Sequence, residues 1–267
     1  MANFKFIYGP VYSWRIGYSL GIDPMATDAK ICTFDCIYCQ LGKKAASKPT
    51  LKIFAPAGKI IEEIKRLPEV TIDYITFSGM GEPTLAKNLR TLIIEIKKNR
   101  QEPIAVLTNS SLLSNKEVRR TLLLADFVIC KLDAYSQDSF KKINKPAAGI
   151  TFAGTFKGIK KFKSEFKGKL ALQIMFLEEN KTALAQFLRI INEIRPDEVQ
   201  INTPLRPCGV KPLAKKGILK VKKYLQRLKG IKVISVYDTR PKKTAAINAA
   251  DVKKRRGRYR QDAILKI

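Results

Sequence analysis

The chain has 267 residues, of which 45% are hydrophobic and 28% are charged, a balance that excludes a disordered protein and suffices for one good core or two small ones. Its 51 Lys and Arg residues against 23 Asp and Glu residues give a net charge of +28, which favours polyanionic partners such as RNA, although a lysine-rich surface without further function has the same composition. The chain contains no histidine, which excludes His-ligated metal sites and every imidazole acid or base.

Apolar runs of strand character alternate along the chain with amphipathic helical patterns. The predicted strands are the weaker candidates RIGYSLGID (15–23) and LKIF (51–54), followed by residues 72–79, 103–110, 127–134, 170–177, 199–204 and 232–237. The predicted helices are residues 57–67, 85–99, 114–125 and 181–194. For the third of these helices, Ser114 with Glu117 predicts a capping box. The alternation predicts an α/β protein with a parallel sheet and right-handed crossovers.

No Gly/Ser linker, composition break or internal repeat divides this pattern. We therefore predict one core domain over residues 1–239 and a basic tail over residues 240–267. No apolar stretch approaches the roughly 18–20 residues of a membrane span, and the N-terminus lacks the apolar region of a secretory signal. Five cysteines, mostly clustered, do not suggest a disulfide framework, so we expect a cytoplasmic protein without a membrane partner.

Polar and unusual residues gather where the predicted strands end. These segments are CTFDCIYC (32–39), GMGEPT (79–84), TNSS (108–111), KLDA (131–134) and TPLRP (203–207). In barrel and open α/β folds the carboxyl ends of parallel strands form the rim that carries the active site. Five such segments on one rim predict one site.

The cysteines in the first of these segments follow the spacing C-x3-C-x2-C, at Cys32, Cys36 and Cys39. A structural zinc ion would need a fourth ligand, and only the distant Cys130 and Cys208 remain to supply one. Iron–sulfur cubanes normally take four thiolates, so three local thiolates leave one iron without a protein ligand. An open coordination position is where a substrate or cofactor binds, and a catalytic cluster therefore fits the count better than a structural one.

This spacing, with Tyr38 directly before the third cysteine, resembles the defining motif of the radical S-adenosylmethionine (SAM) superfamily. The resemblance implies an open, partial (β/α)6 barrel of TIM-barrel type. It also implies that Cys32, Cys36 and Cys39 ligate a [4Fe-4S] cluster whose open iron binds SAM, and that Tyr38 supports the adenine. The family's chemistry would follow, namely reductive cleavage of SAM to a 5′-deoxyadenosyl radical that abstracts hydrogen from a substrate. A one-electron donor of the flavodoxin or ferredoxin kind would be a partner.

A second segment, SGMGEPTL (78–85), resembles the Gly-Gly-Glu-Pro motif of the same superfamily. Met80 stands at the first Gly position, whereas Gly81, Glu82 and Pro83 match. The resemblance implies that this segment holds the methionine ammonium of SAM, for which a carboxylate and backbone carbonyls are suitable partners. Read by itself, the segment is equally consistent with an ordinary turn and helix start.

Asn109 and Asp133 follow the next two predicted strands. In this superfamily, polar residues at such strand ends contact the ribose or carboxylate of SAM, and we assign both residues to cofactor binding on that resemblance. A turn at Asn109 and a helix cap at Asp133 remain alternatives. Lys131 is a weaker candidate for the same cavity. Gln173 and Met175 lie two positions apart on one predicted strand, and only every second residue of a strand points inward.

The N-terminal segment GPVYSWRIGYSLGID (9–23), with INKP (143–146) and INTPLRP (201–207), is similar to the group of wyosine-type tRNA-imidazoguanosine synthases. Those synthases carry a second cluster on three further cysteines upstream of the radical motif. No cysteine precedes Cys32 here, so a second three-thiolate cluster cannot be assembled. Wyosine-type chemistry itself is therefore not expected, and the chain resembles a short relative of that group whose substrate the sequence does not name.

Three functions remain open on the sequence. The first is radical SAM chemistry on a tRNA or other RNA base, supported by basic segments at 160–169, 215–230 and 253–261. The second is the same chemistry on a protein or small metabolite, and the third is RNA binding with a merely structural cluster. An apolar stripe through Ile218, Val221 and Leu225 favours a solvated helix face over RNA contact for the second basic segment. Arg206 is a candidate for a substrate phosphate or carboxylate, and Cys208 for a substrate-facing thiol.

Overall fold

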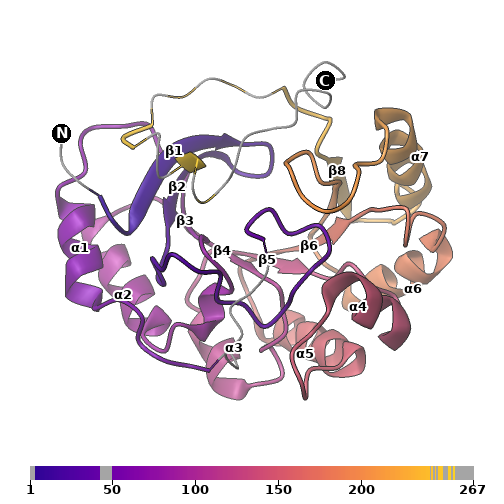
Figure 1. Ribbon diagram of the computed structural model, residues 1–267, viewed down its shortest axis with the longest axis horizontal. Coiled ribbons are helices and arrows are strands. Elements are labelled where there is room, and N and C mark those ends of the chain that lie inside the picture. Colours follow the sequence, from indigo (N-terminus) through magenta and orange to yellow (C-terminus); the bar gives the residue numbers. More distant parts are fainter. Residues whose placement is uncertain are drawn as a thin grey trace.

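A computed structural model of the chain describes residues 4–42 and 50–240, and beyond them residues 242, 244, 246–248, 252, 253 and 255. Its eight strands form one sheet in sequential order, which curves into an open half-barrel (Figure 1). The strands are β1 (Ile7–Ser13), β2 (Gly17–Ile22), β3 (Tyr74–Phe77), β4 (Ile104–Thr108), β5 (Phe127–Lys131), β6 (Lys169–Met175), β7 (Glu198–Asn202) and β8 (Lys232–Ser235). Strands β2 to β8 are parallel, and β1 pairs antiparallel with β2.

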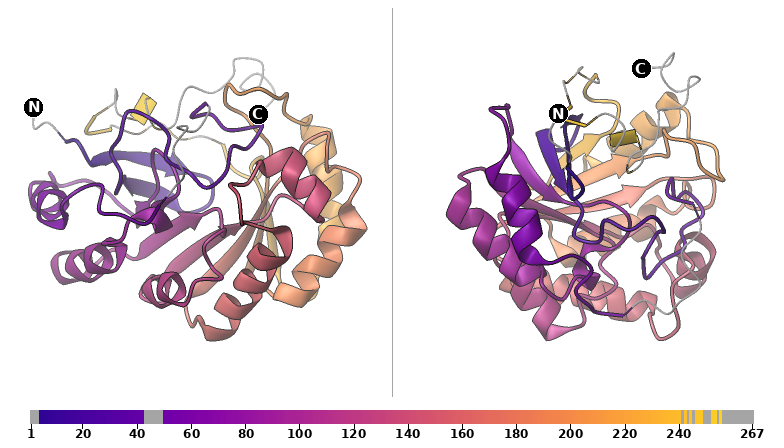
Figure 2. Two further views of the ribbon diagram at one scale, coloured as in Figure 1. Left: turned by 60° about the horizontal axis from the view of Figure 1, so that its bottom comes forward. Right: turned by 60° about the vertical axis from the view of Figure 1, so that its left-hand side comes forward.

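Helices cover the outer, convex face of this sheet, as Figure 2 shows. They are α1 (Ala57–Lys65), α2 (Leu89–Asn99), α3 (Lys116–Leu122), α4 (Gln137–Asn144), α5 (Phe152–Glu165), α6 (Leu184–Ile194) and α7 (Lys215–Leu225), with a 3-10 turn at Pro83–Leu85. A helix connects each successive pair of strands from β2 to β8, because parallel strands need a crossover. The predicted open, partial barrel of TIM-barrel type is confirmed, with an antiparallel hairpin added at its edge.

Alternate residues of each strand face the helices or the barrel interior. In β5, Val128 and Cys130 belong to the main core under the helices, whereas Phe127 and Ile129 pack inside the barrel. Cys130 is fully buried and serves as a small apolar residue. The same alternation directs the side chain of Lys131 to the interior, where the functional site lies.

Three local predictions were wrong. Residues 51–54 form no strand, and Lys52 makes only an isolated bridge to Ala86. Strand β1 was missed because Pro10 within it argues against a strand, yet an edge strand tolerates a proline. Helix α3 begins at Lys116, two residues after the predicted start, because the side chain of Asn115 and not that of Ser114 accepts from the free amides of the first turn.

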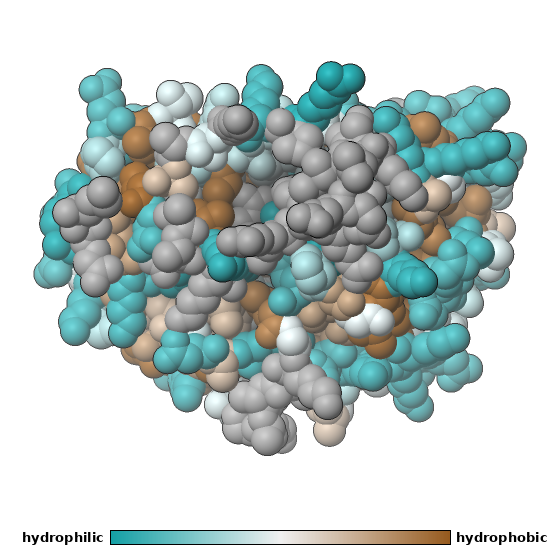
Figure 3. Space-filling view, turned by 45° about the horizontal axis from the view of Figure 1, so that its top comes forward, coloured by the Kyte–Doolittle hydropathy of each residue, from teal (hydrophilic) through white to brown (hydrophobic). Residues whose placement is uncertain are grey.

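Hydrophilic side chains are spread over the face of the molecule shown in Figure 3, with hydrophobic residues between them. On α7 the predicted apolar stripe is confirmed, since Ile218, Val221 and Leu225 are buried. None of the described helices is long and apolar enough to cross a membrane, and the cytoplasmic location stays a prediction.

We expect Asp197→Asn to lower the free energy of unfolding by an amount that depends on pH. Burial alone would raise the pKa of Asp197, but the Lys163 ammonium of α5 and the Leu170 amide, both 2.8 Å from its carboxylate, hold that pKa below the ordinary 3.8. A lowered folded-state pKa stabilises the protein above the unfolded value, and this contribution is lost as the pH falls. The variant should lose about 1 kcal/mol in free energy of unfolding at pH 7.

The measurement is denaturant unfolding of both proteins from pH 7 down to pH 3. The difference between Asp197→Asn and the parent should shrink below about pH 4. A difference of the same size at pH 3 would contradict the assignment.

Candidate functional site

The cysteine-containing loop is hydrogen-bonded to the carboxyl end of β3. Ile31 donates its backbone amide to Met80 O over 2.9 Å, and Glu82 donates its amide to Ile31 O over 3.0 Å. The backbones approach so closely that a Cβ on Gly81 would lie 1.7 Å from Ile31 O. Only glycine fits there, which explains why this position of the GMGEPT segment matches the motif.

Glu82 joins this segment to the end of β4. Its buried carboxylate accepts from the Thr84 amide over 3.2 Å and hydroxyl over 2.6 Å, from the Thr108 hydroxyl over 2.7 Å, and from the Asn109 amide over 2.6 Å. Burial raises the pKa of Glu82, although these hydrogen bonds act in the opposite sense. The carboxylate is thus directed at protein donors, and the predicted contact to an ammonium would depend on the backbone of the segment. Buried Pro83 begins the 3-10 turn that follows.

Side-chain amide groups from the end of β4 and from the last residue of α4 point at the sulfurs of the cysteine loop. Asn109 Nδ2 lies 3.4 Å from Cys32 Sγ, and Asn144 Nδ2 lies 3.4 Å from Cys36 Sγ. Such donors stabilise thiolates bound to a cluster. The Asn109 side chain also accepts from the Ser111 amide over 3.0 Å, so the turn foreseen at this residue is present as well.

The thiols are suited to a cluster more than to free reactivity. Burial raises the pKa of Cys32 to about 12 and that of Cys36 to about 11, so thiolates form here only when metal binding displaces the protons. Within the described residues no three Cys, Asp or Glu side chains surround one point as ligands of a single ion. A cubane instead takes each thiolate on a different iron, and three thiols with amide donors fit that donor set.

Lys30, directly before the loop, was not predicted from the sequence. It is buried, and its ammonium lies 3.1 Å from both Asp35 Oδ1 and Gly42 O. These contacts span the cysteine loop and hold its two ends together. This buried lysine, which interacts electrostatically with Cys32 and Cys39, also supplies positive charge where a cluster would bring negative charge.

A hydrogen-bond network orients Tyr38. Its hydroxyl donates a short hydrogen bond to the buried Asp133 carboxylate, which also accepts from Asn144 Nδ2 over 3.0 Å and from the Met175 amide over 2.7 Å. Burial and the Asp133 carboxylate raise the pKa of Tyr38 well above its usual range. The Lys131 ammonium lies 5.0 Å from the centre of the Tyr38 ring. Asp133 is no helix cap, because Ser136 caps α4.

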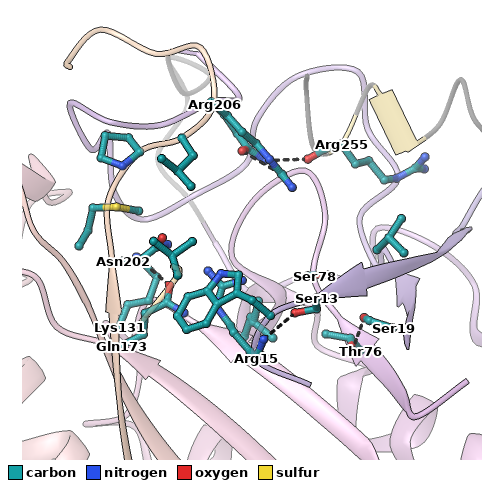
Figure 4. A pocket seen from close by; sticks show the side chains of 18 of the residues that line it. Ser13, Arg15, Ser19, Thr76, Ser78, Lys131, Gln173, Asn202, Arg206 and Arg255 are labelled. Carbon is teal, nitrogen blue, oxygen red and sulfur yellow. Dashed lines mark hydrogen bonds between the residues drawn. The ribbon is translucent and has the colours of Figure 1, made fainter. Parts of the chain in front are cut away.

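A cavity of about 310 Å³ opens inside the half-barrel next to this network. Its wall includes Tyr38 and Cys39 of the cysteine loop and Gly79 after β3. The polar residues labelled in Figure 4 that line it are Ser13, Arg15, Ser19, Thr76, Ser78, Lys131, Gln173, Asn202, Arg206 and Arg255. Met175 also lines it, so Lys131, Gln173, Met175 and Arg206 face one space.

The other predicted residues lie behind the cavity wall, in contact with it or with the cysteine loop. Asn109 is hydrogen-bonded to Cys32, and Asp133 is hydrogen-bonded to Tyr38. Cys208 is half-buried in an apolar cluster with Tyr38 and Met175, and its thiol donates to Val210 O over 3.3 Å. It does not line this cavity.

Arg255 of the predicted basic tail is part of this site. Its guanidinium lies 3.0 Å from the buried Asp23 carboxylate and 2.6 Å from Lys5 O, and its backbone carbonyl accepts from Gln40 Nε2 over 3.2 Å. Nothing in the local sequence indicated this return of the chain to the barrel. Arg258, Tyr259 and Arg260, considered for RNA binding, lie outside the described residues, and the division at residue 240 stays a prediction.

We expect the aromatic ring of Tyr38, not its hydroxyl, to matter for SAM binding. The ring lines the cavity, and stacking of a base on an aromatic side chain is worth about 1–3 kcal/mol. Tyr38→Ala should weaken SAM binding by about tenfold or more, whereas Tyr38→Phe should stay within about threefold. Equilibrium dialysis of SAM with the reconstituted proteins measures both, and equal losses would assign the role to the hydroxyl.

Comparisons with known proteins agree with this geometry. A family model described as the radical SAM superfamily matches residues 28–191. A UPF0026 protein of Synechocystis is 43% identical over 212 residues, which cover 79% of this chain and 78% of that protein. A Brachyspira hyodysenteriae protein named GTPase Obg is 40% identical over 258 residues, which cover 93% of this chain but only 38% of that protein. A probable GTP 3′,8-cyclase of Saccharolobus solfataricus is 24% identical over 214 residues, which cover 79% of this chain and 67% of that protein.

Solved structures show the same fold at low sequence identity. Streptococcus suis SuiB bound to the precursor peptide SuiA aligns with a TM-score of 0.65 and 15% identity over 83% of this chain and 50% of that one. An archaeal TYW1 aligns with a TM-score of 0.56 and 16% identity over 80% of this chain and 74% of that one. The chain thus spans about half the length of the SuiB chain.

Proposed function

The chain belongs to the radical SAM superfamily, and we propose that it binds a [4Fe-4S] cluster through Cys32, Cys36 and Cys39. Such a cluster supplies the electron that cleaves SAM into methionine and a 5′-deoxyadenosyl radical, which takes hydrogen from the substrate. The observation that carries the proposal is the placement of the cysteine loop. It is hydrogen-bonded to the end of β3 and brings Cys39 and Tyr38 to the wall of the barrel cavity.

In this proposal the residues of the chain bind SAM, orient it and exclude water from the cavity. Backbone groups of the segment around Gly81, positioned by the Ile31 contacts, would receive the SAM ammonium. Tyr38, oriented by Asp133, would support the adenine. Because the cavity lies inside the half-barrel, bound SAM and substrate would be shielded from bulk solvent, which protects a radical from side reactions.

Anaerobic reconstitution with iron and sulfide tests this proposal. The reconstituted chain, given SAM and a one-electron reductant such as dithionite, should release 5′-deoxyadenosine, detectable by mass spectrometry. A flavodoxin- or ferredoxin-like protein is expected to support the same reaction as electron donor in place of dithionite. If the chain bound about one cubane through three thiols and released no 5′-deoxyadenosine, the cluster would be structural only, and the assignment as an enzyme would be wrong.

For the substrate we propose a nucleotide, as part of a tRNA or other RNA. Three observations support this choice: the net charge of +28, the cationic side chains on the cavity wall, and the similarity to a protein named probable GTP 3′,8-cyclase. A modified-nucleoside profile of cells that lack the protein should miss one species. Copurified RNA should be released steeply by added salt.

The competing proposal is the same chemistry on a protein or small metabolite. An unchanged nucleoside profile, together with 5′-deoxyadenosine formation in vitro, would favour that alternative. The two assays are independent, because SAM cleavage is measured without knowledge of the substrate.

A further inference from the structure

Arg255, far along the chain from the cysteine loop, is held on the wall of the cavity by residues of the N-terminal part. Its side chain is buried, and Figure 4 shows it at the upper side of the cavity. Arg255 Nε lies 3.0 Å from Asp23 Oδ2, and Nη2 donates to Lys5 O over 2.6 Å. The guanidinium also lies 5.3 Å from the centre of the Tyr8 ring. These three partners together restrict the arginine to one orientation.

Asp23, the carboxylate partner of Arg255, is attached to the segment that follows β3. Its carboxylate accepts from the Met80 amide over 3.2 Å and from the Met25 amide over 3.1 Å. It also packs directly on Gly79, where an added Cβ would lie 2.3 Å from Asp23 Cγ. Asp23 is only 1% exposed, and a buried carboxylate is costly unless a cation and hydrogen bonds compensate it. Arg255 supplies such a cation.

The backbone around Met80 depends on contacts of this kind for its conformation. The glycines on either side of Met80 have positive φ angles of +144° and +157°, and glycine restricts its own backbone less than any other residue. Ile31 holds this segment through two backbone hydrogen bonds. The Met80 amide, which these two bonds do not use, is held by Asp23. Through that carboxylate, Arg255 helps to fix the backbone for which we proposed contact with the SAM ammonium.

Arg255 also contacts the cysteine loop. Its backbone carbonyl accepts from Gln40 Nε2 over 3.2 Å, and Gln40 directly follows Cys39. The cysteine loop and the segment after β3 are already joined through Ile31. Arg255 adds a second connection between them, because its carbonyl contacts the loop and its guanidinium contacts the segment through Asp23.

We propose that Arg255 is a positioning residue of the cofactor site, which acts through Asp23 on the Met80 backbone. It does not contact SAM itself but fixes the orientation in which the segment after β3 presents its backbone to the ammonium. The inference rests on the proposed function in taking this segment as part of the SAM site. It assigns to one residue of the basic segment 253–261 a role inside the barrel, whereas the charge of that segment alone favoured RNA contact.

Hydrogen exchange of the metal-free full chain, followed by mass spectrometry, tests the positioning without any cofactor. In Arg255→Met the buried Asp23 carboxylate loses this cation, and the Met80 amide should exchange faster by about tenfold or more. Arg119→Met is the matched control, because Arg119 is also buried and its Nε lies 2.9 Å from Glu165 Oε2. Arg119 does not line the cavity, and its replacement should leave the exchange of the Met80 amide within about twofold of the parent. Equal exchange in the parent and Arg255→Met, or equal acceleration in both variants, would overturn the proposal.

Equilibrium dialysis of SAM with the anaerobically reconstituted full chain gives the second readout. Arg255→Met should weaken SAM binding by about tenfold or more at the iron content of the parent, because the three cysteines remain in place. Arg255→Lys, which keeps a positive charge beside Asp23 but loses the planar fork, should recover part of this loss. Arg119→Met should bind SAM within about twofold of the parent. Unchanged binding in Arg255→Met, or equal weakening in Arg119→Met, would overturn the proposal.

If Arg255→Met does not fold or does not retain iron, the same comparison is made between Arg255→Lys and Arg119→Lys. Weaker SAM binding in Arg255→Lys alone supports the positioning role, and equal binding in the two variants overturns it.

The two proposals can fail separately. A parent chain that binds no SAM would defeat the proposed function, and the exchange of the Met80 amide would still decide whether Arg255 fixes the segment. A parent chain that binds SAM and releases 5′-deoxyadenosine, with SAM binding unchanged in Arg255→Met, would keep the proposed function and overturn the inference.

Discussion

Cys39→Ala is expected to abolish 5′-deoxyadenosine release, by on the order of 100-fold or more, and to reduce bound iron to background. A cubane held by only three protein thiolates would not stay bound after the loss of one of them, because one of its irons already lacks a protein ligand. Cys39 is half-buried on the cavity wall, so its replacement by alanine should cost little packing. The loss is therefore expected in iron content and product, with the unfolding midpoint of the metal-free chain nearly unchanged.

Cys208→Ala is the matched control for this substitution. Cys208 is also half-buried, and its thiol contacts Val210 O near Tyr38 without lining the cavity. It should keep the iron content of the parent and most of the product. Iron retained in Cys39→Ala, or lost equally in Cys208→Ala, would contradict the assignment of the three ligands. Iron analysis and mass spectrometry of the same preparations measure both quantities.

Gly81→Ala is expected to disrupt both stability and cluster binding. The added methyl group would lie 1.7 Å from Ile31 O and 2.5 Å from Ile31 C, and backbone atoms cannot move aside as a flexible side chain does. The two hydrogen bonds that join Ile31 to Met80 and Glu82 would have to break. We expect a loss of about 3 kcal/mol or more in free energy of unfolding, and a cysteine loop separated from the end of β3.

Gly58→Ala provides the comparison. Gly58 lies in the first turn of α1, and no atom outside its own helix lies within 4 Å of an added Cβ. Alanine there should stabilise the protein by up to about 1 kcal/mol, because glycine is the more flexible residue in a helix. Denaturant unfolding with and without the reconstituted cluster measures both variants. If Gly81→Ala unfolded at the same denaturant concentration as the parent protein and kept its iron, the close contact would not matter for the site.

Much of the fold could be predicted because its signals are local. Each buried strand from 72–79 onward carries its own apolar run, and helices such as α6 carry an apolar stripe at the helical period, so the alternation of the two predicts crossovers without any long-range information. Helices α4 and α5 were not predicted individually, and strand β1 was obscured by Pro10. A proline argues against a central strand, and only the completed sheet shows that β1 lies at its edge.

The candidate site, like the fold, was predicted only in part from the sequence. The spacing of Cys32, Cys36 and Cys39 within one short loop gives the number of thiolates, and the number alone leaves one iron of a cubane open. Gly81 was identified through the resemblance of its segment, which follows a predicted strand, to a motif of the superfamily. The tertiary structure adds that a backbone contact with Ile31 requires this glycine, and that the Glu82 carboxylate is directed at Thr108 and Asn109.

The sequence by itself indicated the radical SAM superfamily, because the motif that carries the resemblance, Cys32, Cys36 and Cys39, lies within one short stretch of the chain. The shape and charge of the cavity were decided by the tertiary structure, because they depend on residues that are distant along the chain. Arg255 and Asp23 form their ion pair across 232 positions, and Trp14 meets Leu205 only when the edge hairpin lies beside the loop after β7. No local spacing predicts such contacts, since they follow from the curvature of the whole sheet.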